Sequence, residues 1–148
     1  TSLDTNTVKS NDAITNMQGN TIQNVVLHRS SQKFYSGGVL SSAGVRPVSY
    51  EIATYHSYTI NSTGITLQLA DWPSSGKYAE IVLELRGRGQ ADTVTFSTEN
   101  SGSIKVATGF AHPATIDDNV HPYIYRFWTI DGGQTVYGEY KGEFDTVL

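Results

Sequence analysis

The stretch that most constrains the fold is 121–141, which has the sequence HPYIYRFWTIDGGQTVYGEYK. Asp131, Gly132 and Gly133 lie near its centre, and a tripeptide of this kind supplies the positive-φ positions that a tight turn between two strands needs. The residues on either side are mainly Tyr, Phe, Trp, Val and Ile, which fit the pleated surface of a sheet. The stretch therefore predicts a β-hairpin.

The first arm of this hairpin is apolar on both faces. Alternation places three aromatic side chains on one face: Tyr123, Tyr125 and Phe127. It places three further apolar side chains on the other face: Ile124, Trp128 and Ile130. Only Arg126 interrupts the second face. Such a strand needs cover on both sides, so one face packs on the domain's own core and the other on a second sheet, a loop or another subunit.

Short strands with one buried face are predicted before the hairpin. Charged residues make up only 16% of the chain, whereas Gly, Ser and Thr are abundant, and this balance favours strands and turns over surface helices. Alternation gives three strands with clear inward-facing sets: Ile65, Leu67 and Leu69; Ala79, Ile81, Leu83 and Leu85; Val94 and Phe96. Weaker patterns predict one strand over 49–60 and two more near 104–106 and 110–116.

With the hairpin arms these elements make about eight strands, the number found in a double-sheet jelly roll. The fold predicted for residues 24–148 is therefore all-β, a jelly-roll-like β-sandwich knob. A sandwich of another topology fits the same strands. Residues 30–45 are expected to form a loop-rich connection anchored by Phe34 and Tyr35.

Residues 1–23 differ in composition, since they lack aromatic residues and proline and are rich in Asn, Thr and Ser. Leu3, Ile14 and Val25 recur every eleven residues, a spacing closer to a helical stripe than to strand alternation. A single helix with so few apolar positions is marginal in water, but it becomes stable when copies of it pack together along the apolar stripe. Residues 1–23 are thus predicted to form the end of a coiled-coil stalk of two or three copies, with Leu3, Ile14 and Met17 at the subunit interface. A disordered tail is the alternative.

Several classes of site find no support in the sequence. No cysteine is present, which removes disulfides, thiolate metal sites and cysteine nucleophiles. The four histidines lack metal-ligand spacing, 117–119 lacks the pattern of a calcium loop, and there is no Gly-x-Ser-x-Gly. With a net charge of -4 and no block of Lys or Arg, sequence-specific binding of nucleic acid is not expected. The prediction is a protein that is not an enzyme and needs no metal or cofactor.

Three residues are candidates for ligand binding: Trp72, Tyr78 and Arg126. Trp72 precedes Pro73 in a predicted turn, where it is expected to close one end of the core or, alternatively, to offer a ring on which a sugar stacks. Arg126 lies among aromatic residues and is expected to meet a carboxylate or an aromatic face, within the chain or in another subunit.

Three segments resemble a domain that ends many virion proteins of tailed bacteriophages: LADWPSSGKYAEIVLEL at 69–85, Thr-Val-Thr-Phe at 93–96 and FWTIDGGQTVYGEY at 127–140. Proteins of this kind include tail-needle knobs and tail-fibre tips. MQGNTIQNV at 17–25 is similar to the Asn-rich segments that close the stalks of such fibres. The likeness covers residues 21–142.

This resemblance implies a homotrimer at the tip of the virion tail, joined to other tail proteins through the upstream stalk. Such a knob contacts the host cell envelope and assists penetration and DNA ejection, without a cofactor. Packing around a three-fold axis would cover the second face of the hairpin. Tyr123, Tyr125, Phe127 or Trp128 is therefore expected at the subunit interface.

Other functions fit the same resemblance less closely. One is a tail-fibre tip that binds a surface glycan or another receptor, with Trp72 and Tyr78 as stacking groups. Another is a tailspike module that cleaves polysaccharide, although the sequence shows no carboxylate constellation for such a reaction. A trimeric jelly roll of non-viral origin is a further alternative.

Overall fold

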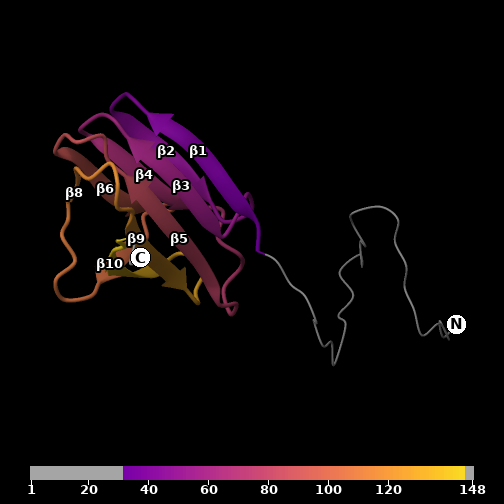
Figure 1. Cartoon of the computed structure of the whole chain (residues 1–148). Coiled ribbons are helices and arrows are strands. Elements are labelled where there is room, and N and C mark those ends of the chain that lie inside the picture. Colours follow the sequence, from indigo (N-terminus) through magenta and orange to yellow (C-terminus); the bar gives the residue numbers. More distant parts are fainter. Residues whose placement is uncertain (1–31, 146–148) are drawn as a thin grey trace, which may run out of the picture. The chain divides into compact units, whose positions relative to one another are not determined.

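The computed structural model of the chain describes residues 32–145, and these form strands without any helix (Figure 1). The ten strands are β1 (Phe34–Leu40), β2 (Gly44–Ser49), β3 (Tyr55–Ile60), β4 (Ile65–Ala70), β5 (Ala79–Arg86), β6 (Asp92–Thr98), β7 (Ser103–Val106), β8 (Ala114–Ile116), β9 (Tyr123–Thr129) and β10 (Thr135–Glu143). Within this range there is no helix long and apolar enough to cross a membrane. The predicted stalk, with Leu3, Ile14 and Met17, lies outside the described residues.

The strands form two sheets that face each other across one core. The larger sheet has six strands in the order β1-β3-β5-β9-β10-β7, and the smaller has four in the order β2-β4-β6-β8. From β1 to β9 successive strands alternate between the sheets. In the larger sheet β1, β3 and β5 pair in parallel, and in the smaller sheet β2, β4 and β6 do so as well. The predicted all-β sandwich is confirmed.

The strand order differs from the predicted jelly roll. A jelly roll is built from antiparallel Greek keys, whereas most neighbours in both sheets here are parallel and only the pairs of β9 with β5 and β10, and of β6 with β8, are antiparallel. The jelly-roll topology was therefore a wrong prediction. Alternation along a strand defines its buried face but carries no information on the direction of its neighbours, which lie far away in the sequence.

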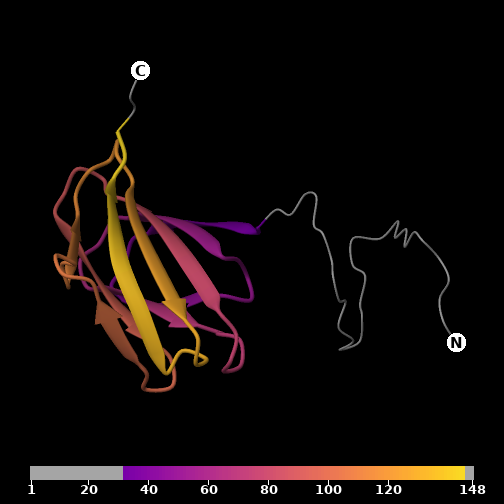
Figure 2. The ribbon, with the colours of Figure 1, turned by 90° about the horizontal axis from the view of Figure 1, so that it is seen from below.

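The predicted hairpin is confirmed as β9 and β10, with β9 between β5 and β10 in the six-stranded sheet (Figure 2). Gly132 and Gly133 have φ angles of 71° and 84°, as the turn requires. Asp131 fixes the turn, since its carboxylate accepts the backbone N–H of Thr135 at 2.9 Å. An added Cβ at Gly133 would lie 2.3 Å from Cδ1 of Trp72, so this glycine also makes room for the tryptophan.

The core lies between the inward faces of the two sheets. The clear alternating sets predicted for β4, β5 and β6 all point into it. Phe127 on β9 is completely buried, with its ring centroid 5.0 Å from that of Phe96 on β6 and 6.0 Å from that of Phe110. This contact joins the two sheets, and full burial of such a side chain contributes about 1.5–3 kcal/mol.

Two predicted elements are wrong. Residues 30–45 contain strand β1 and the start of β2 rather than a loop, and 49–60 is divided by a turn over 50–54 rather than forming one strand. Gly37 and Gly38 mark a bulge in β1, and Pro47 lies within β2. Both strands are edge strands, where a missing N–H or an irregular register costs little. Residues that usually interrupt strands are tolerated there.

Candidate binding surface on the six-stranded sheet

The outer face of the six-stranded sheet carries a cluster of charged and aromatic side chains around Arg126. Arg126 points outward from β9 because its neighbours Tyr125 and Phe127 point into the core. Its guanidinium donates from Nε to Glu80 at 2.6 Å, from Nη1 to Glu139 at 3.2 Å and from Nη2 to the Tyr78 hydroxyl at 2.9 Å. These partners come from β5, β10 and the loop before β5.

Arg126 also lies over an aromatic ring. Its Cζ is 5.1 Å from the centroid of Trp128, a distance within the range of a cation–π contact. The expectation that Arg126 meets a carboxylate or an aromatic face is therefore confirmed, and both partners belong to the same chain. The guanidinium is fixed on three sides, which makes it a rigid part of the surface.

The protonation states of this cluster are settled by its hydrogen bonds. Burial alone would raise the pKa of Glu80, but hydrogen bonds from Tyr78 and Arg126 outweigh it and lower that pKa. Burial and the hydrogen bond to Glu80 raise the pKa of Tyr78, while hydrogen bonds to Glu80 and Glu139 raise that of Arg126. A glycosidase needs one carboxylic acid with a raised pKa. Glu80 has the opposite shift, so its carboxylate is suited to holding Arg126 rather than to acting as that acid.

A row of four side chains crosses the same face from the edge of the sheet towards its middle. In the strand register, Lys105 on β7 lies opposite Tyr137 on β10, Tyr137 opposite Trp128 on β9, and Trp128 opposite Glu80 on β5. Strands are about 4.8 Å apart, so the row is about 14 Å long. The rings of Trp128 and Tyr137 stack with their centroids 5.8 Å apart and their planes 20° apart.

A hollow of about 350 Å³ lies at the Lys105 end of this row, lined by Lys105, Val106, Ala107, Trp128, Tyr137 and Gly138. Because Trp128 covers one face of the Tyr137 ring, the other face is directed towards β7 and the hollow. Tyr137 is 38% exposed. The hollow therefore combines an aromatic wall, an apolar floor and one cation.

The predicted ligand residues do not all come together. Tyr78 and Arg126 are hydrogen-bonded partners on the outer face. Trp72 is only 8% exposed and belongs to the core, where it stacks on Tyr50 and lies against Gly133. It closes one end of the core, as one of the two interpretations predicted, and its ring is not available for stacking by a sugar at the surface.

The residues predicted for the subunit interface divide between the two faces of β9. Tyr123, Tyr125 and Phe127 are buried within the single chain, covered by the four-stranded sheet and the loops beside it. Their burial within one chain leaves these three side chains little surface to offer to a partner subunit. Trp128 lies on the outer face and is half-buried, so of the four it is the one placed to contact another molecule.

Five exposed apolar side chains lie on the edge strands β1 and β2 and in the turn after β2: Phe34, Tyr35, Val39, Val45 and Ile52. A second hollow, of about 300 Å³, opens between the two edges and is lined in part by Tyr35, Ile52, His56 and Tyr58. Single exposed apolar residues are normal on a monomer, but a group of this kind is typical of an interaction surface. This surface is called the β1–β2 edge below.

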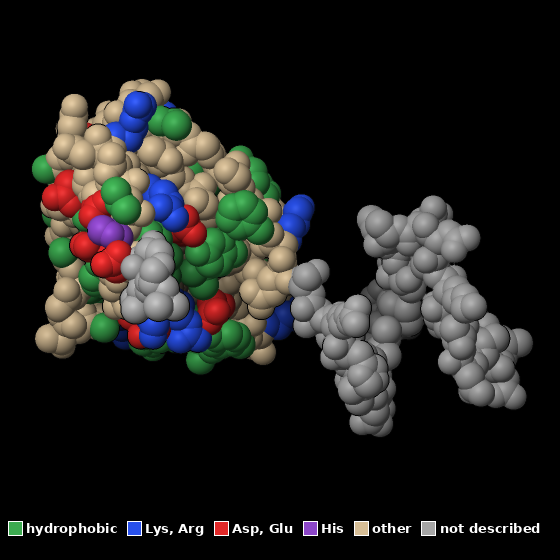
Figure 3. Space-filling model, viewed as in Figure 1, with side chains coloured by type: hydrophobic (Ala, Val, Ile, Leu, Met, Phe, Trp, Pro, Cys, Tyr) green, Lys and Arg blue, Asp and Glu red, His purple; other side chains and the backbone are tan. Residues whose placement is uncertain are grey.

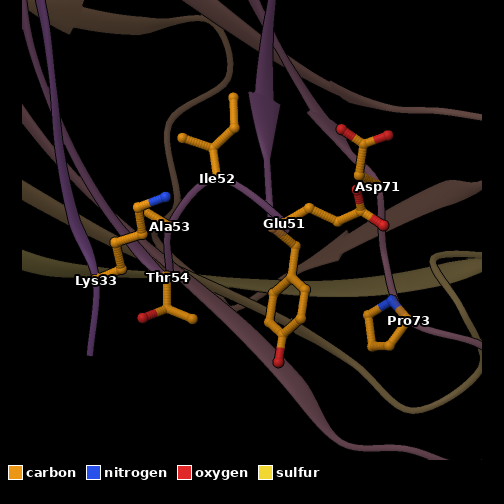
Figure 4. Close-up of a pocket in the computed structure, with 8 residues that line it drawn as sticks. Lys33, Glu51, Ile52, Ala53, Thr54, Asp71 and Pro73 are labelled. Carbon is orange, nitrogen blue, oxygen red and sulfur yellow. The ribbon is translucent and has the colours of Figure 1, made fainter. Parts of the chain in front are cut away.

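A depression of about 320 Å³ lies at the end of the sandwich, between the turn after β2 and the loop after β4 (Figure 4). Lys33, Glu51 and Asp71 supply its charges. It lies on exposed loops, and nowhere within residues 32–145 are three or more His, Asp or Glu side chains grouped as they would be to hold a metal. The face seen in Figure 3 likewise mixes Lys and Arg with Asp and Glu among apolar side chains.

Two residues of the row on the outer face of the six-stranded sheet, Tyr137 and Lys105, were not among the predicted site residues. The position of Tyr137 could have been found, because a hairpin turn centred on Asp131, Gly132 and Gly133 places it opposite Trp128. Lys105 has no such local signal, since β7 pairs with β10 across a long stretch of chain.

Searches against protein-family models, curated proteins and solved structures find no match to this chain. The function of this surface is therefore inferred from its own geometry.

Proposed function

We propose that this chain is the distal knob of a tail needle or tail fibre of a tailed bacteriophage. In this role it is a structural virion protein at the tail tip, a homotrimer that contacts the host cell envelope and assists penetration and genome delivery. The segments at 69–85, 93–96 and 127–140 support the family. The observation that carries the assembly is the β1–β2 edge, with exposed apolar side chains on the outermost strand of each sheet.

The β1–β2 edge suits contact with further copies of the chain. β1 and β2 are the outermost strands on the same side of the two sheets, so each presents backbone N–H and C=O groups that no neighbouring strand of residues 32–145 uses. A stalk that ends near residue 23 would hold three copies of the chain together. In this proposal the subunit interface of the knob is the β1–β2 edge, because Tyr123, Tyr125 and Phe127 are already buried within one chain.

The assembly is tested by light scattering on the full chain. The expected mass is that of a trimer. Val45→Glu combined with Phe34→Glu introduces charge on the β1–β2 edge and is expected to weaken the trimer, with a lower mass at low concentration. Val120→Glu is the matched control, because Val45 and Val120 are similarly exposed, at 55% and 62%, and Val120 lies in the loop before β9. A monomeric full chain would contradict the homotrimer.

The place in the virion is tested by electron microscopy of the phage that encodes the chain. Antibodies raised against the purified chain are expected to label the tail tip, and antibodies absorbed beforehand with that chain are expected to leave it unlabelled. Labelling of the capsid, or of no part of the virion, would contradict the tail-tip location.

A tail-fibre tip that binds a surface glycan is the second candidate, and the exposed pair of Trp128 and Tyr137 favours it. A polysaccharide-cleaving module is less well supported, since Glu80 and Glu139 are both engaged by Arg126. Release of reducing ends from host polysaccharide by the purified chain would favour cleavage over binding.

A further inference from the structure

We propose that the hollow between β7 and the β9–β10 hairpin binds one anionic sugar residue, with its ring on Tyr137 and its carboxylate on Lys105. This inference rests on the proposed contact with the cell envelope and names the surface and the chemical class involved. Trp72, Tyr78 and Arg126, the residues first considered for ligand binding, are not its principal groups.

The aromatic geometry supports a stacked ring at this position. Tyr137 lies between two neighbours in register, Trp128 on one side and Lys105 on the other. The Trp128 ring occupies one face of Tyr137 and holds it upright on the sheet. The remaining face lines the hollow together with Val106 and Ala107. A pyranose has a face of C–H groups that packs on such a ring, as apolar groups do on aromatic surfaces.

The charges around the hollow select an anion. Lys105 is the one charged residue among those that line it. It makes no ion pair with any carboxylate in residues 32–145. Two acidic groups on the same face of the sheet, Glu80 and Glu139, are held by Arg126, and Lys141 is 3.5 Å from Glu139. The unpaired ammonium is therefore free for a ligand carboxylate, and a charged hydrogen bond of this kind is stronger than a neutral one.

The size of the hollow fits a single residue of a glycan rather than a long chain. A volume of about 350 Å³ is near the lower end of the range for small-molecule sites. The hollow opens at the edge of the sheet beside β7, so the rest of a glycan can extend outward from it. The sugar bound there is most simply a terminal or branching acidic residue.

The two tryptophans give the experiment a built-in reference. The full chain is titrated with D-glucuronate while the two indole N–H signals are followed by NMR, after assignment with Trp128→Phe. The Trp128 signal is expected to move to saturation and the signal of buried Trp72 to stay in place. D-glucose, which has the ring without the charge, and acetate, which has the charge without the ring, are each expected to bind at least about tenfold more weakly.

Variants then assign the two contacts. Tyr137→Ala is expected to abolish the saturable shift and Tyr137→Phe to retain it, because stacking needs the ring and not the hydroxyl. Lys105→Gln is expected to remove the preference for glucuronate over glucose. Lys33→Gln is the matched control, since it removes one positive charge at the opposite edge of the same sheet, near β1.

Each opposite result overturns the inference. No saturable response to glucuronate, an equal response to glucose, or binding unchanged in Tyr137→Ala would show that this hollow is not such a site. A chain that forms trimers but does not respond to glucuronate would contradict the sugar site and leave the proposed trimer unaffected. A chain that binds glucuronate as a monomer would support the site and count against the proposed trimer.

Discussion

The two faces of β9 are both rich in aromatic residues, yet they have different roles. Tyr123, Tyr125 and Phe127 on the inner face are buried against the other sheet, whereas Arg126 and Trp128 on the outer face lie among charged groups and open to solvent. The difference comes from what neighbouring strands present to each face. The apolar content of a strand therefore shows that it is important for packing but does not show which side is the core.

The comparison of these faces predicts unequal losses of stability. Phe127→Ala leaves a cavity where the two sheets meet and is expected to reduce the free energy of unfolding by about 3–5 kcal/mol. Trp128→Ala removes a larger ring from a half-buried surface position and is expected to cost less than about 1.5 kcal/mol. Denaturant unfolding at one fixed protein concentration measures both. Equal losses would mean that the outer face is covered in solution, as by another subunit.

The turn of the hairpin allows a sharper test of the inner face. Gly133→Ala introduces a Cβ about 2.3 Å from Trp72 at a φ of 84°, and is expected to cost about 2–4 kcal/mol because the backbone is strained and Trp72 must move.

Gly76→Ala is the matched control for Gly133→Ala. Gly76 has a φ of 88°, but no atom lies within 4 Å of its added Cβ, so this variant reports the backbone strain without the collision. The difference between the two variants is the energy of closing the core with Trp72. Changed tryptophan fluorescence in Gly133→Ala alone is expected. Equal effects of the two substitutions would contradict that role of Trp72.

The outer face is expected to respond weakly to loss of its central charge. Arg126→Met leaves Glu80 and Glu139 without their shared partner, and is expected to cost about 0.2–1 kcal/mol, since partly exposed ion pairs contribute little. The pKa of Glu80 should rise, because a donor that lowers it is gone. NMR titration of the Glu80 carboxyl measures this. An unchanged pKa would mean that Tyr78 alone keeps it low.

Local patterns predicted what local sequence determines. Alternation identified β4, β5 and β6, and Asp131, Gly132 and Gly133 identified the hairpin, because turn geometry and burial act within a few residues. Strands β1 and β2 were missed since glycines and a proline interrupt them, and only their position at the sheet edges makes those residues acceptable. The parallel pairing of alternate strands depends on contacts between distant segments, and so could not be seen.

The binding surface shows the same division between local and distant information. Arg126 stood out because it is a single charge in an aromatic strand, and its need for a carboxylate follows from its chemistry. Its partner Glu80 lies 46 residues away, and on a strand with one wet side its role was not apparent. Lys105 acquires a function only when β7 pairs with β10. Residues were thus predicted singly, whereas their grouping came from the topology.

Two histidines extend the comparison of inside and outside to the effect of pH. His56 is buried, with Nε2 2.9 Å from the carbonyl oxygen of Ala53, and burial lowers its pKa below the usual 6.5 despite that hydrogen bond. His121 is near the surface, with Nδ1 2.7 Å from Asp118 and Nε2 3.0 Å from Asp145. Its hydrogen bond to Asp118 raises its pKa above 6.5. The folded state therefore favours neutral His56 and protonated His121.

These shifts predict a shallow maximum of stability near the ordinary histidine pKa of 6.5. The contribution of neutral His56 is fully present above that pH and is lost as the pH falls towards the lowered pKa. The contribution of protonated His121 is fully present below it and is lost as the pH rises through the raised pKa. Denaturant unfolding between about pH 5 and 8 measures both limbs. His121→Asn should flatten the alkaline limb and His56→Gln the acid limb, and a profile unchanged by both variants would show that neither histidine is coupled to folding.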